Sequence, residues 1–423
     1  MISFVRISFL SLLNRKVTSI LTVISLALSV CLFLLVDKMK DAAQSGFTQS
    51  ISQTDLIVGS RGGTLNLLLY TVFNMGNATN NVSWQSYQEL KANPGVEWSI
   101  PYSLGDGHRG FRTVATNEDF FKHYRFRGTE QVQLAEGKIF EGLWDVVLGS
   151  EVAKKLDYRV GQKIVIAHGI TRGETGMLEH DDKPFHVVGI LKQTGTPIDR
   201  SIYITLEGME ALHMDWQDGA YPVKDKLIPQ DQIQKKDIQI SAITSFFLRM
   251  KSRIDVLRFQ RQINTFKDEP LMAIIPGVEL SELWRMMDVV ENVLRVISIL
   301  ILVIGIGSML IALLTTLNER RREMAIFRAL GATPWRLTYF LVFEAFLLSA
   351  AGILTGILLN FIFLISCRHY LQNEFNFYFE TLLMSVSAMI FLLVILGCGV
   401  LVGLIPAIQS KNRALKDGLT QYH

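Results

Sequence analysis

The histidines are the residues with the clearest capacity for chemistry, because histidine is the side chain that most often binds metals and exchanges protons near neutral pH. Six of the eight lie in one long polar segment: His108, His123, His168, His180, His186 and His213. His180 directly precedes Asp181 and Asp182. The spacings match no standard zinc motif, and scattered histidines are common in surface loops. We therefore predict no metal site, with His180, His186 and His168 as the candidate ligands if one forms.

Nucleotide or hydrolase chemistry would need motifs that this chain lacks. It contains no G-x-x-x-x-G-K-[ST] loop to hold ATP phosphates, no nucleophile elbow and no H-E-x-x-H pair. We expect no enzymatic activity and no cofactor in this chain, so that any ATP hydrolysis takes place on a partner subunit. A net charge of +3 over 423 residues gives no reason to expect nucleic acid binding.

A basic amphipathic stretch at 318–336 is the strongest candidate for contacting another protein. Met324, Phe327 and Leu330 recur with helical spacing among charged residues, and Gly331 can end the helix. We predict a cytoplasmic coupling helix that docks in a groove of another protein. The residues assigned to it are Glu319, Arg320, Glu323, Met324, Phe327, Leu330 and Gly331. The simpler alternative is that its arginines only set membrane topology.

Four long apolar runs indicate a membrane protein. Hydrophobic residues make up 49% of the chain and charged residues 19%, with a mean hydropathy of +0.28, whereas soluble proteins are usually more charged. A helix needs ~20 residues to cross the hydrocarbon core, and in lipid only a helix satisfies its own backbone groups. We predict transmembrane helices at 17–37, 289–317, 337–367 and 381–408.

Lysine and arginine determine the expected orientation, because they gather on the cytoplasmic side. They precede the first helix, fill the link between the second and third, and follow the fourth. We therefore place an amphipathic helix at 1–16 and a tail at 409–423 in the cytoplasm, with 38–288 and a loop at 368–380 outside. The first run is longer than a signal peptide requires, and Val30 does not fit a cleavage box, so we expect it to remain uncleaved.

The segment 38–288 is predicted to fold as a large α+β extracytoplasmic domain inserted between helices 1 and 2. Short β-rich runs alternate with helical stretches and are bounded by Gly, Pro or Asp. We predict one lobe formed by 42–140 and 236–285, and a second, inserted lobe at 141–230. The segment has no cysteine, so an apolar core must hold it together. Leu65–Phe73 is either a buried core helix or an apolar edge that touches a lipidic or protein substrate.

A few glycines and one glutamate inside the apolar runs are expected to affect how the membrane helices pack. Gly352 and Gly356 have the G-x-x-x-G spacing that lets membrane helices approach closely, and so do Gly399 and Gly403. Glycine is also simply common in membrane helices. We predict a packing role for all four. Glu344 lies near the inner end of the third helix, where a carboxylate is costly, and we assign it a structural or coupling role rather than proton transport.

Charged residues mark both ends of the segment 38–288. Glu291 and Arg295 are one helical turn apart and are expected to form an ion pair. Neither junction resembles a flexible Gly/Ser linker. We predict that helix continues through both junctions, which would make them stiff connections between the membrane and the outer domain. The alternative is that these charges only mark the membrane interface.

Three stretches of the chain resemble one known family. They are NERRREMAIFRALGATPWRLTYFLVFEAFLLSAAGILTGILLN (318–360), VVLGSEVAKKLDYRVGQKIVI (146–166) and FHVVGILKQTGTPIDRSIYITLEGMEAL (185–212). Together with the four-helix layout, they resemble the FtsX/MacB-like ABC transporter permeases of the MacB/LolC/LolE superfamily, with a MacB-like periplasmic core domain. The resemblance covers essentially the whole chain.

The resemblance implies a permease homodimer or heterodimer that is embedded in the lipids of the bacterial inner membrane. It also implies a cytoplasmic ABC ATPase dimer whose ATP-driven closure moves the outer domains, as in lipoprotein release or in efflux or uptake assemblies with periplasmic or outer-membrane partners. The alternative is a signalling or scaffold protein that regulates an extracytoplasmic partner such as a cell-wall hydrolase. ATP-dependent movement of a substrate would separate the two. Scarce intramembrane charges disfavour an ion-driven carrier.

Overall fold

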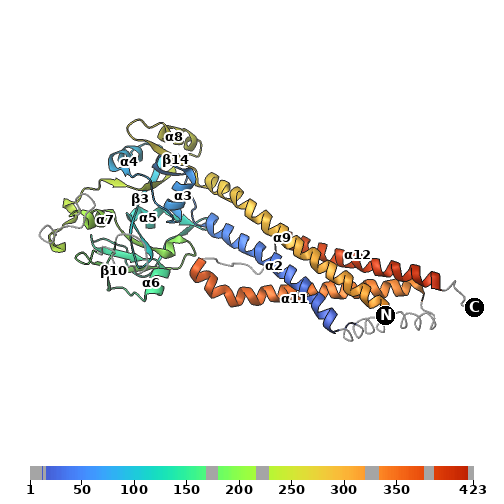
Figure 1. The fold of residues 1–423 in the computed structure, drawn as a ribbon. Helices are drawn as coiled ribbons and strands as arrows, with labels where there is room; N and C mark the ends of the chain where they lie inside the picture. Colours follow the sequence, from blue (N-terminus) through green and yellow to red (C-terminus); the bar gives the residue numbers. More distant parts are fainter. Residues whose placement is uncertain are drawn as a thin grey trace, which may run out of the picture. The chain divides into compact units, whose positions relative to one another are not determined.

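The chain divides into two compact units (Figure 1). The structure is a computed structural model that describes residue 12 and residues 16–167, 180–215, 228–319, 333–375 and 385–417. We call residues 1–42, 287–375 and 379–423 the helical unit, and residues 43–286 and 376–378 the sheet unit. Residues 43–286 of the sheet unit have bounds close to the 38–288 expected for an outer domain.

The helical unit is made of long apolar helices. In the described residues four helices are long and apolar enough to cross a membrane: α2 (Lys16–Gln49), α9 (Pro276–Glu319), α11 (Pro334–Phe375) and α12 (Val386–Asp417). Their candidate spans are Lys16–Asp41, Pro276–Thr315, Thr338–Cys367 and Val386–Pro406. Large hydrophobic side chains are exposed along all four, as lipid-facing surfaces require. The four spans expected from hydropathy are confirmed by length and composition.

The helices of this unit extend beyond the apolar runs that identify them. α11 begins at Pro334, a residue suited to the first helical position, and continues to Phe375. It therefore enters the region 368–380 that was expected to be a loop, because residues 368–375 contain neither Gly nor Pro to end a helix. α12 begins at Val386, later than the expected 381, where the Ser385 hydroxyl accepts a hydrogen bond from the Ala388 N–H at 3.1 Å.

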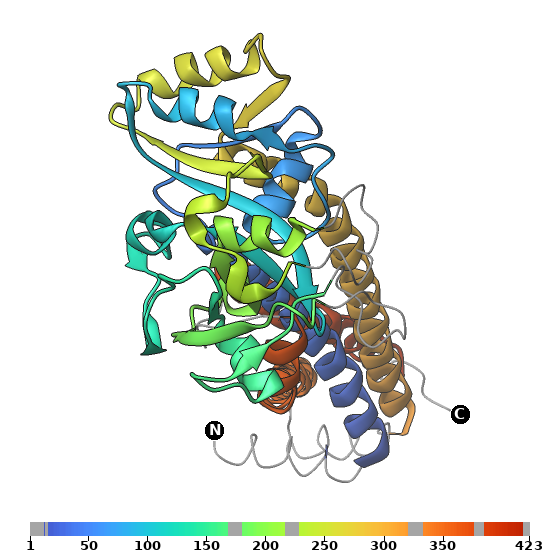
Figure 2. The ribbon, with the colours of Figure 1, turned by 90° about the vertical axis from the view of Figure 1, so that its left-hand side faces the viewer.

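One mixed sheet forms the centre of the sheet unit (Figure 2). Among the described residues it has ten strands, in the order β14-β1-β13-β3-β4-β11-β8-β10-β7, with β9 paired to β10. Neighbours are antiparallel, except that β4 pairs parallel to β11 and β8 parallel to β10. The strands are β1 (Leu56–Ser60), β3 (Val96–His108), β4 (Phe111–Thr116), β7 (Leu134–Gly137), β8 (Asp145–Leu148), β9 (Lys163–Ile164), β10 (Phe185–Leu191), β11 (Ser201–Thr205), β13 (Ser245–Met250) and β14 (Leu271–Ile274).

The two lobes expected from the sequence share this sheet. One half, β14, β1, β13, β3 and β4, comes from 42–140 and 236–285, and β11, β8 and β10 come from 141–230. The halves join where β4 and β11 pair, from Arg112 opposite Ser201 to Thr116 opposite Thr205. β7 belongs to the first segment but pairs with β10 at the far edge. Backbone hydrogen bonds therefore run without interruption from one lobe to the other.

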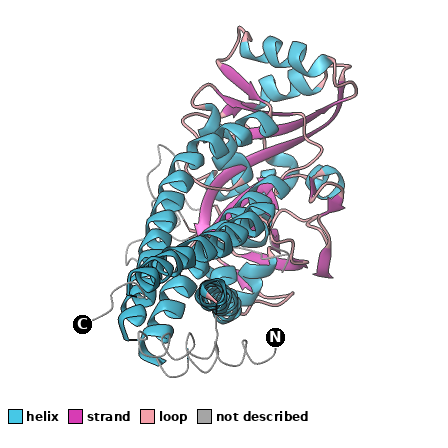
Figure 3. Ribbon diagram, turned by 90° about the vertical axis from the view of Figure 1, so that its right-hand side faces the viewer, coloured by secondary structure: helices cyan, strands magenta, loops and turns pink. Residues whose placement is uncertain are grey.

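Helices cover both faces of the sheet (Figure 3). Side chains alternate along each strand, so Phe246 and Leu248 of β13 belong to one buried cluster and Phe247 to the other. The first cluster includes residues of α4 (Trp84–Lys91), α6 (Ser150–Leu156), α7 (Leu206–His213) and α8 (Asp255–Asn264), and the second those of α3 (Thr64–Val72) and α5 (Glu118–His123). The smaller elements are β2 (Val82–Ser83), β5 (Arg125–Phe126), β6 (Glu130–Gln131), β12 (Ala242–Ile243), η1 (Pro197–Arg200), η4 (Gln230–Gln232) and η5 (Lys235–Asp237).

The apolar stretch Leu65–Phe73 is a core helix. It coincides with α3, whose residues Leu67, Leu68, Tyr70, Thr71 and Val72 are buried. Leu67 and Leu68 pack in the same cluster as Ile57 of β1. The alternative of an exposed apolar edge for substrate is therefore wrong, since the side chains that would have formed it are inside the sheet unit.

Candidate functional site

A cluster of polar side chains joins α2, α9 and α12 in the helical unit. On α2 and α9 it lies close in the chain to the boundaries with the sheet unit, at residues 42/43 and 286/287. Lys40 Nζ of α2 lies 2.5 Å from Glu291 Oε2 of α9, and Arg295 forms a second ion pair with Glu291. Asp37 of α2 accepts hydrogen bonds from the hydroxyls of Ser385, at 2.5 Å, and Ser387, at 3.0 Å. We call these residues the end cluster. The ion pair expected between Glu291 and Arg295 is confirmed, and Lys40 extends it to a second helix.

The end cluster fixes the register of the helices more than it stabilises them. The Lys40 side chain is 40% exposed and that of Glu291 16%, and ion pairs with such exposure contribute about 1 kcal/mol or less. The geometric effect of the Lys40–Glu291 pair is larger, because its two partners lie on different helices. Sliding α2 along α9 by one turn would move its groups by about 5.4 Å and break the pair. The arrangement therefore holds α2, α9 and the start of α12 in one alignment.

Glycines allow close helix contacts deeper in the helical unit. A Cβ atom placed on Gly352 of α11 would lie 2.6 Å from Leu26 Cβ of α2, and one on Gly356 would lie 2.6 Å from Val30 Cβ and 2.8 Å from the Ala27 carbonyl oxygen. Such distances are too short for any side chain, so α11 and α2 approach here only because both positions are glycine.

The second glycine pair lies at another helix contact. A Cβ on Gly399 of α12 would lie 1.9 Å from Ser349 Oγ of α11, and one on Gly403 would lie 2.5 Å from Ala345 Cβ. The contact between α11 and α2 is therefore made at the glycines of α11. The contact between α11 and α12 is made at the glycines of α12. Glu344 is buried in α11, next to Ala345. All four glycines thus lie at contacts between helices, and the structural or coupling role assigned to Glu344 stays a prediction.

The segment expected to couple to another protein lies almost wholly outside the described residues. Glu319 is the last residue of α9, and the description resumes at Thr333. The other residues assigned to docking fall in the undescribed range: Arg320, Glu323, Met324, Phe327, Leu330 and Gly331. Docking by this segment therefore stays a prediction.

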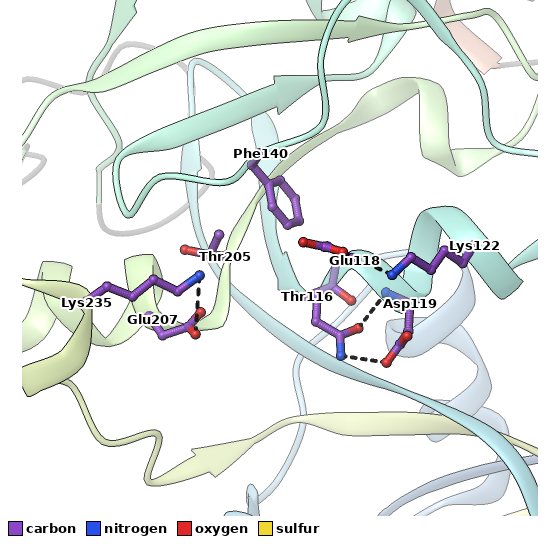
Figure 4. A pocket seen from close by; sticks show the side chains of 9 residues that line it. Thr116, Glu118, Asp119, Lys122, Phe140, Thr205, Glu207 and Lys235 are labelled. Atoms are coloured by element: carbon purple, nitrogen blue, oxygen red, sulfur yellow. Dashed lines mark hydrogen bonds and ion pairs between the residues drawn. The ribbon is translucent and has the colours of Figure 1, made fainter.

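A polar pocket in the sheet unit has no counterpart in the sequence analysis (Figure 4). Its volume is about 270 Å³, and it is lined by Thr116, Asn117, Glu118, Asp119, Lys122, Phe140, Thr205, Glu207 and Lys235. Both lysines already have carboxylate partners: Lys122 Nζ lies 3.0 Å from Glu118 and Lys235 Nζ lies 3.6 Å from Glu207. Ligand pockets are usually lined mainly by apolar groups. This one is open and internally paired, so we assign it no chemistry.

The structure groups the histidines differently from the sequence. His186 is exposed on β10, and His168 lies outside the described residues. His180 is buried and lies instead with His213 at the end of α7 and Asp106 of β3. Burial opposes protonation of His213, but the hydrogen bond and charge of Asp106 outweigh it, so the pKa of His213 is raised above its usual value. Asp106 had no signal in the sequence, because 74 residues separate it from His180.

These features define a multi-pass membrane protein in which one large α+β unit lies in the chain between the first and second of four apolar helices. Two family descriptions match it: "MacB-like periplasmic core domain" over residues 19–266 and "FtsX-like permease C-terminal" over residues 295–415. The chain therefore belongs to the FtsX-like ABC transporter permeases that carry a MacB-like periplasmic core domain. The resemblance stated from the sequence is confirmed.

Individual relatives are distant. The chain is 22% identical over 421 residues to the macrolide export ATP-binding/permease protein MacB of Campylobacter jejuni, covering 96% of this chain and 59% of that protein. It is 20% identical over 403 residues to the lipoprotein-releasing system transmembrane protein LolE of Haemophilus influenzae, covering 89% and 87%. The periplasmic region of MacB from Actinobacillus actinomycetemcomitans is 10% identical, with a TM-score of 0.35 over 55% of this chain and 94% of that one, which is too low to argue from.

Proposed function

We propose that this permease transmits ATP-driven motion from a cytoplasmic ATPase to its sheet unit, which acts on a substrate or partner outside the membrane. Family members are permease components of ABC transporters, and the chain has no phosphate-binding loop of its own. In this proposal a partner ATPase binds and hydrolyses ATP, and the part described by this sequence transmits the resulting movement.

The continuity of α9 is the observation that carries this proposal. α9 runs as one helix from Pro276 to Glu319, across the boundary between the units at Met286 and Met287. Its first turns pack into the core of the sheet unit through Leu280, with Leu283 and Trp284 against the same cluster. From Val278 to Ile304 it contains neither Gly nor Pro. A tilt of α9 in the membrane therefore pulls directly on the core of the sheet unit.

α2 supplies a second connection of the same kind. It runs as one helix from Lys16 to Gln49, across the boundary at Ala42 and Ala43. The Lys40–Glu291 pair joins it to α9 close to that boundary. Two continuous helices that are held together resist independent tilting, so both would move as one lever. The helical continuity expected at both junctions is confirmed, and its role in transmission is the proposal.

A flexible Gly/Ser segment inserted after Met286 tests the lever. We expect the partner ATPase to remain bound and to hydrolyse ATP, while the ATP-dependent change in hydrogen exchange of residues 43–286 is lost. The same insertion after Gly128, in the exposed turn between β5 and β6, is the matched control and should leave that change intact. The variant Leu330→Asp should have the opposite effect on binding. The ATPase should no longer bind, because a charge would enter the apolar groove of the partner that receives this segment. If the Met286 insertion keeps the ATP-dependent change, transmission through α9 is wrong.

We further propose that both termini and the segment 318–336 are cytoplasmic, on the distribution of lysine and arginine. The test is labelling by an impermeant thiol reagent in a chain whose three cysteines are replaced by serine. Thr129, exposed in the sheet unit, and Arg320 are replaced by cysteine one at a time. In cells with a permeabilised outer membrane we expect label at position 129 only. Label at position 320 before the inner membrane is opened would reverse the orientation.

A further inference from the structure

Three side chains that can bind a metal converge in the sheet unit from distant parts of the chain. They are Asp106, His180 and His213, and one donor atom from each lies within 4.8 Å of the others. Asp106 Oδ2 is 3.1 Å from His213 Nε2 and 3.7 Å from His180 Nε2. The two imidazole rings are nearly perpendicular, at 88°, with centroids 5.5 Å apart. Asp106 and His180 are buried, and the His213 side chain is 34% exposed.

These distances are compatible with a tetrahedral metal site. Zinc binds imidazole nitrogen and carboxylate oxygen at about 2.0–2.2 Å, so two ligands of one tetrahedron lie roughly 3.3–3.5 Å apart. The separations of 3.1 and 3.7 Å fall on either side of this value. All three donor atoms lie within 4.8 Å of one another, so small side-chain rotations would bring them to the spacing of metal ligands.

The second ring nitrogen of His213 is already held in place. His213 Nδ1 lies 2.9 Å from the backbone carbonyl oxygen of Met209, one turn earlier in α7, and donates to it in the tautomer that frees Nε2. Metal-binding histidines usually make such a bond with the nitrogen that does not bind the metal, which orients the ring. His213 Nε2 faces Asp106, and a bound metal ion would take the place of the proton in the hydrogen bond between them. The carbonyl end of α7 also favours positive charge at this point.

Backbone contacts bring Asp106 and His180 together. The pairing of β3 with β4 shifts register between Leu104 and Gly107, which places Asp106 in an irregular part of the strand. Gly107 exchanges two backbone hydrogen bonds with Ala167, and the His180 N–H donates to the carbonyl oxygen of Ile166, next to Ala167, at 2.9 Å. One short backbone segment, Ile166–Ala167, thus holds both ligand-bearing segments.

A buried ion pair joins the two histidine-bearing segments. Lys183, three residues after His180, pairs with Asp215, two residues after His213, and both side chains are almost fully buried. The Lys183 N–H also donates to the His180 carbonyl oxygen at 3.1 Å, forming a turn. The positions of the two histidines are therefore set by contacts that do not involve the ligand atoms, which is the preorganisation that a metal site needs.

We propose that Asp106, His180 and His213 bind a divalent transition metal ion of the zinc class, with a fourth position open to water through the exposed edge of His213. Two imidazoles and one carboxylate suit Zn²⁺, whereas Mg²⁺ and Ca²⁺ take oxygen ligands. The site is separate from the two helices of the proposed lever, because none of its three residues belongs to α2 or α9.

Metal titration of the purified full-length chain tests this site. After removal of metal by chelation, Zn²⁺ is titrated against a chromophoric competitor, and we expect one site per chain. His213→Gln, His180→Gln and Asp106→Asn should each weaken binding about 100-fold or more, since even changes around a metal ligand cost 10- to 100-fold. His186→Gln, which changes an exposed histidine on β10, is the matched control and should bind like the unchanged chain.

A spectroscopic measurement on the unchanged chain does not depend on the variants folding. Its Co²⁺ complex should show the visible bands of a four-coordinate nitrogen and oxygen site and no thiolate charge-transfer band, because the three cysteines lie in the helical unit. Zn²⁺ should also raise the midpoint of thermal unfolding in the unchanged chain and not in Asp106→Asn. A thiolate band, absence of stoichiometric binding, or equal loss in His186→Gln and His213→Gln would overturn the proposal.

Discussion

Gly356→Leu should destabilise the helical unit by about 3 kcal/mol, because a side chain at this position has no space. Its Cβ alone would lie 2.6 Å from Val30 Cβ and 2.8 Å from the Ala27 carbonyl oxygen. The second atom belongs to the backbone of α2, so no change of rotamer relieves the clash, and the two helices must separate. The measurement is the midpoint of unfolding of the purified chain in increasing amounts of a denaturing detergent.

Two other glycines supply the control for this result. Among the residues that the structure describes, nothing beyond the adjacent residues and backbone of its own helix lies within 4 Å of a Cβ placed on Gly307 of α9 or Gly397 of α12. Gly307→Leu and Gly397→Leu should unfold at or slightly above the midpoint of the unchanged chain, since leucine favours helix more than glycine by about 0.8 kcal/mol. If either shifts the midpoint as far as Gly356→Leu, crowding between α2 and α11 is not the cause of the loss.

Lys183→Ala should destabilise the sheet unit by about 3–5 kcal/mol, because it leaves a carboxylate buried without its cation. Lys183 and Asp215 form an ion pair in which the lysine side chain is 1% exposed and the aspartate side chain 0%. Asp182, whose carboxylate lies 3.8 Å from Lys183 Nζ, carries the same charge as Asp215 and so cannot take the place of the lysine. The measurement is chemical unfolding of the full-length chain, followed by tryptophan fluorescence in the presence of a metal chelator.

A double variant separates the loss of the charge pair from the loss of packing. Lys183→Met with Asp215→Asn removes both charges and keeps an acceptor for the Ile228 N–H, which bonds to Asp215 at 3.3 Å. It should recover most of the stability, since an uncharged pair of similar size costs little. Lys138→Ala, which breaks an exposed pair with Glu141, should change stability by less than about 1 kcal/mol. Equal effects of Lys183→Ala and Lys138→Ala would contradict the buried pair.

The features that were predictable from the sequence depend on neighbours in the chain. A membrane span needs only enough apolar residues in a row, so α2, α9, α11 and α12 were found from hydropathy alone. The Glu291–Arg295 pair follows from helical spacing. Helix ends were less well predicted: α11 continues past the expected end at 367 because its exit has no helix-breaking residue.

The features that only the tertiary structure decided join residues far apart in the chain. Lys40 contacts Glu291 and Asp37 contacts Ser385 across the helical unit. Local patterns carry no information on such pairs, because many different partners are compatible with the same amphipathic face. The sheet likewise joins the two expected lobes through the pairing of β4 with β11, which alternation along either strand does not specify.

The histidines show the same division. Their number and their place in the polar segment followed from the sequence, which offered His180, His186 and His168 as candidate ligands although their spacings match no standard site. The fold instead brings His180 to Asp106 and His213, through a strand irregularity, one backbone segment and a buried ion pair. A metal site requires donor atoms a few ångströms apart, and that proximity is set by the packing of strands and helices rather than by spacing along the chain.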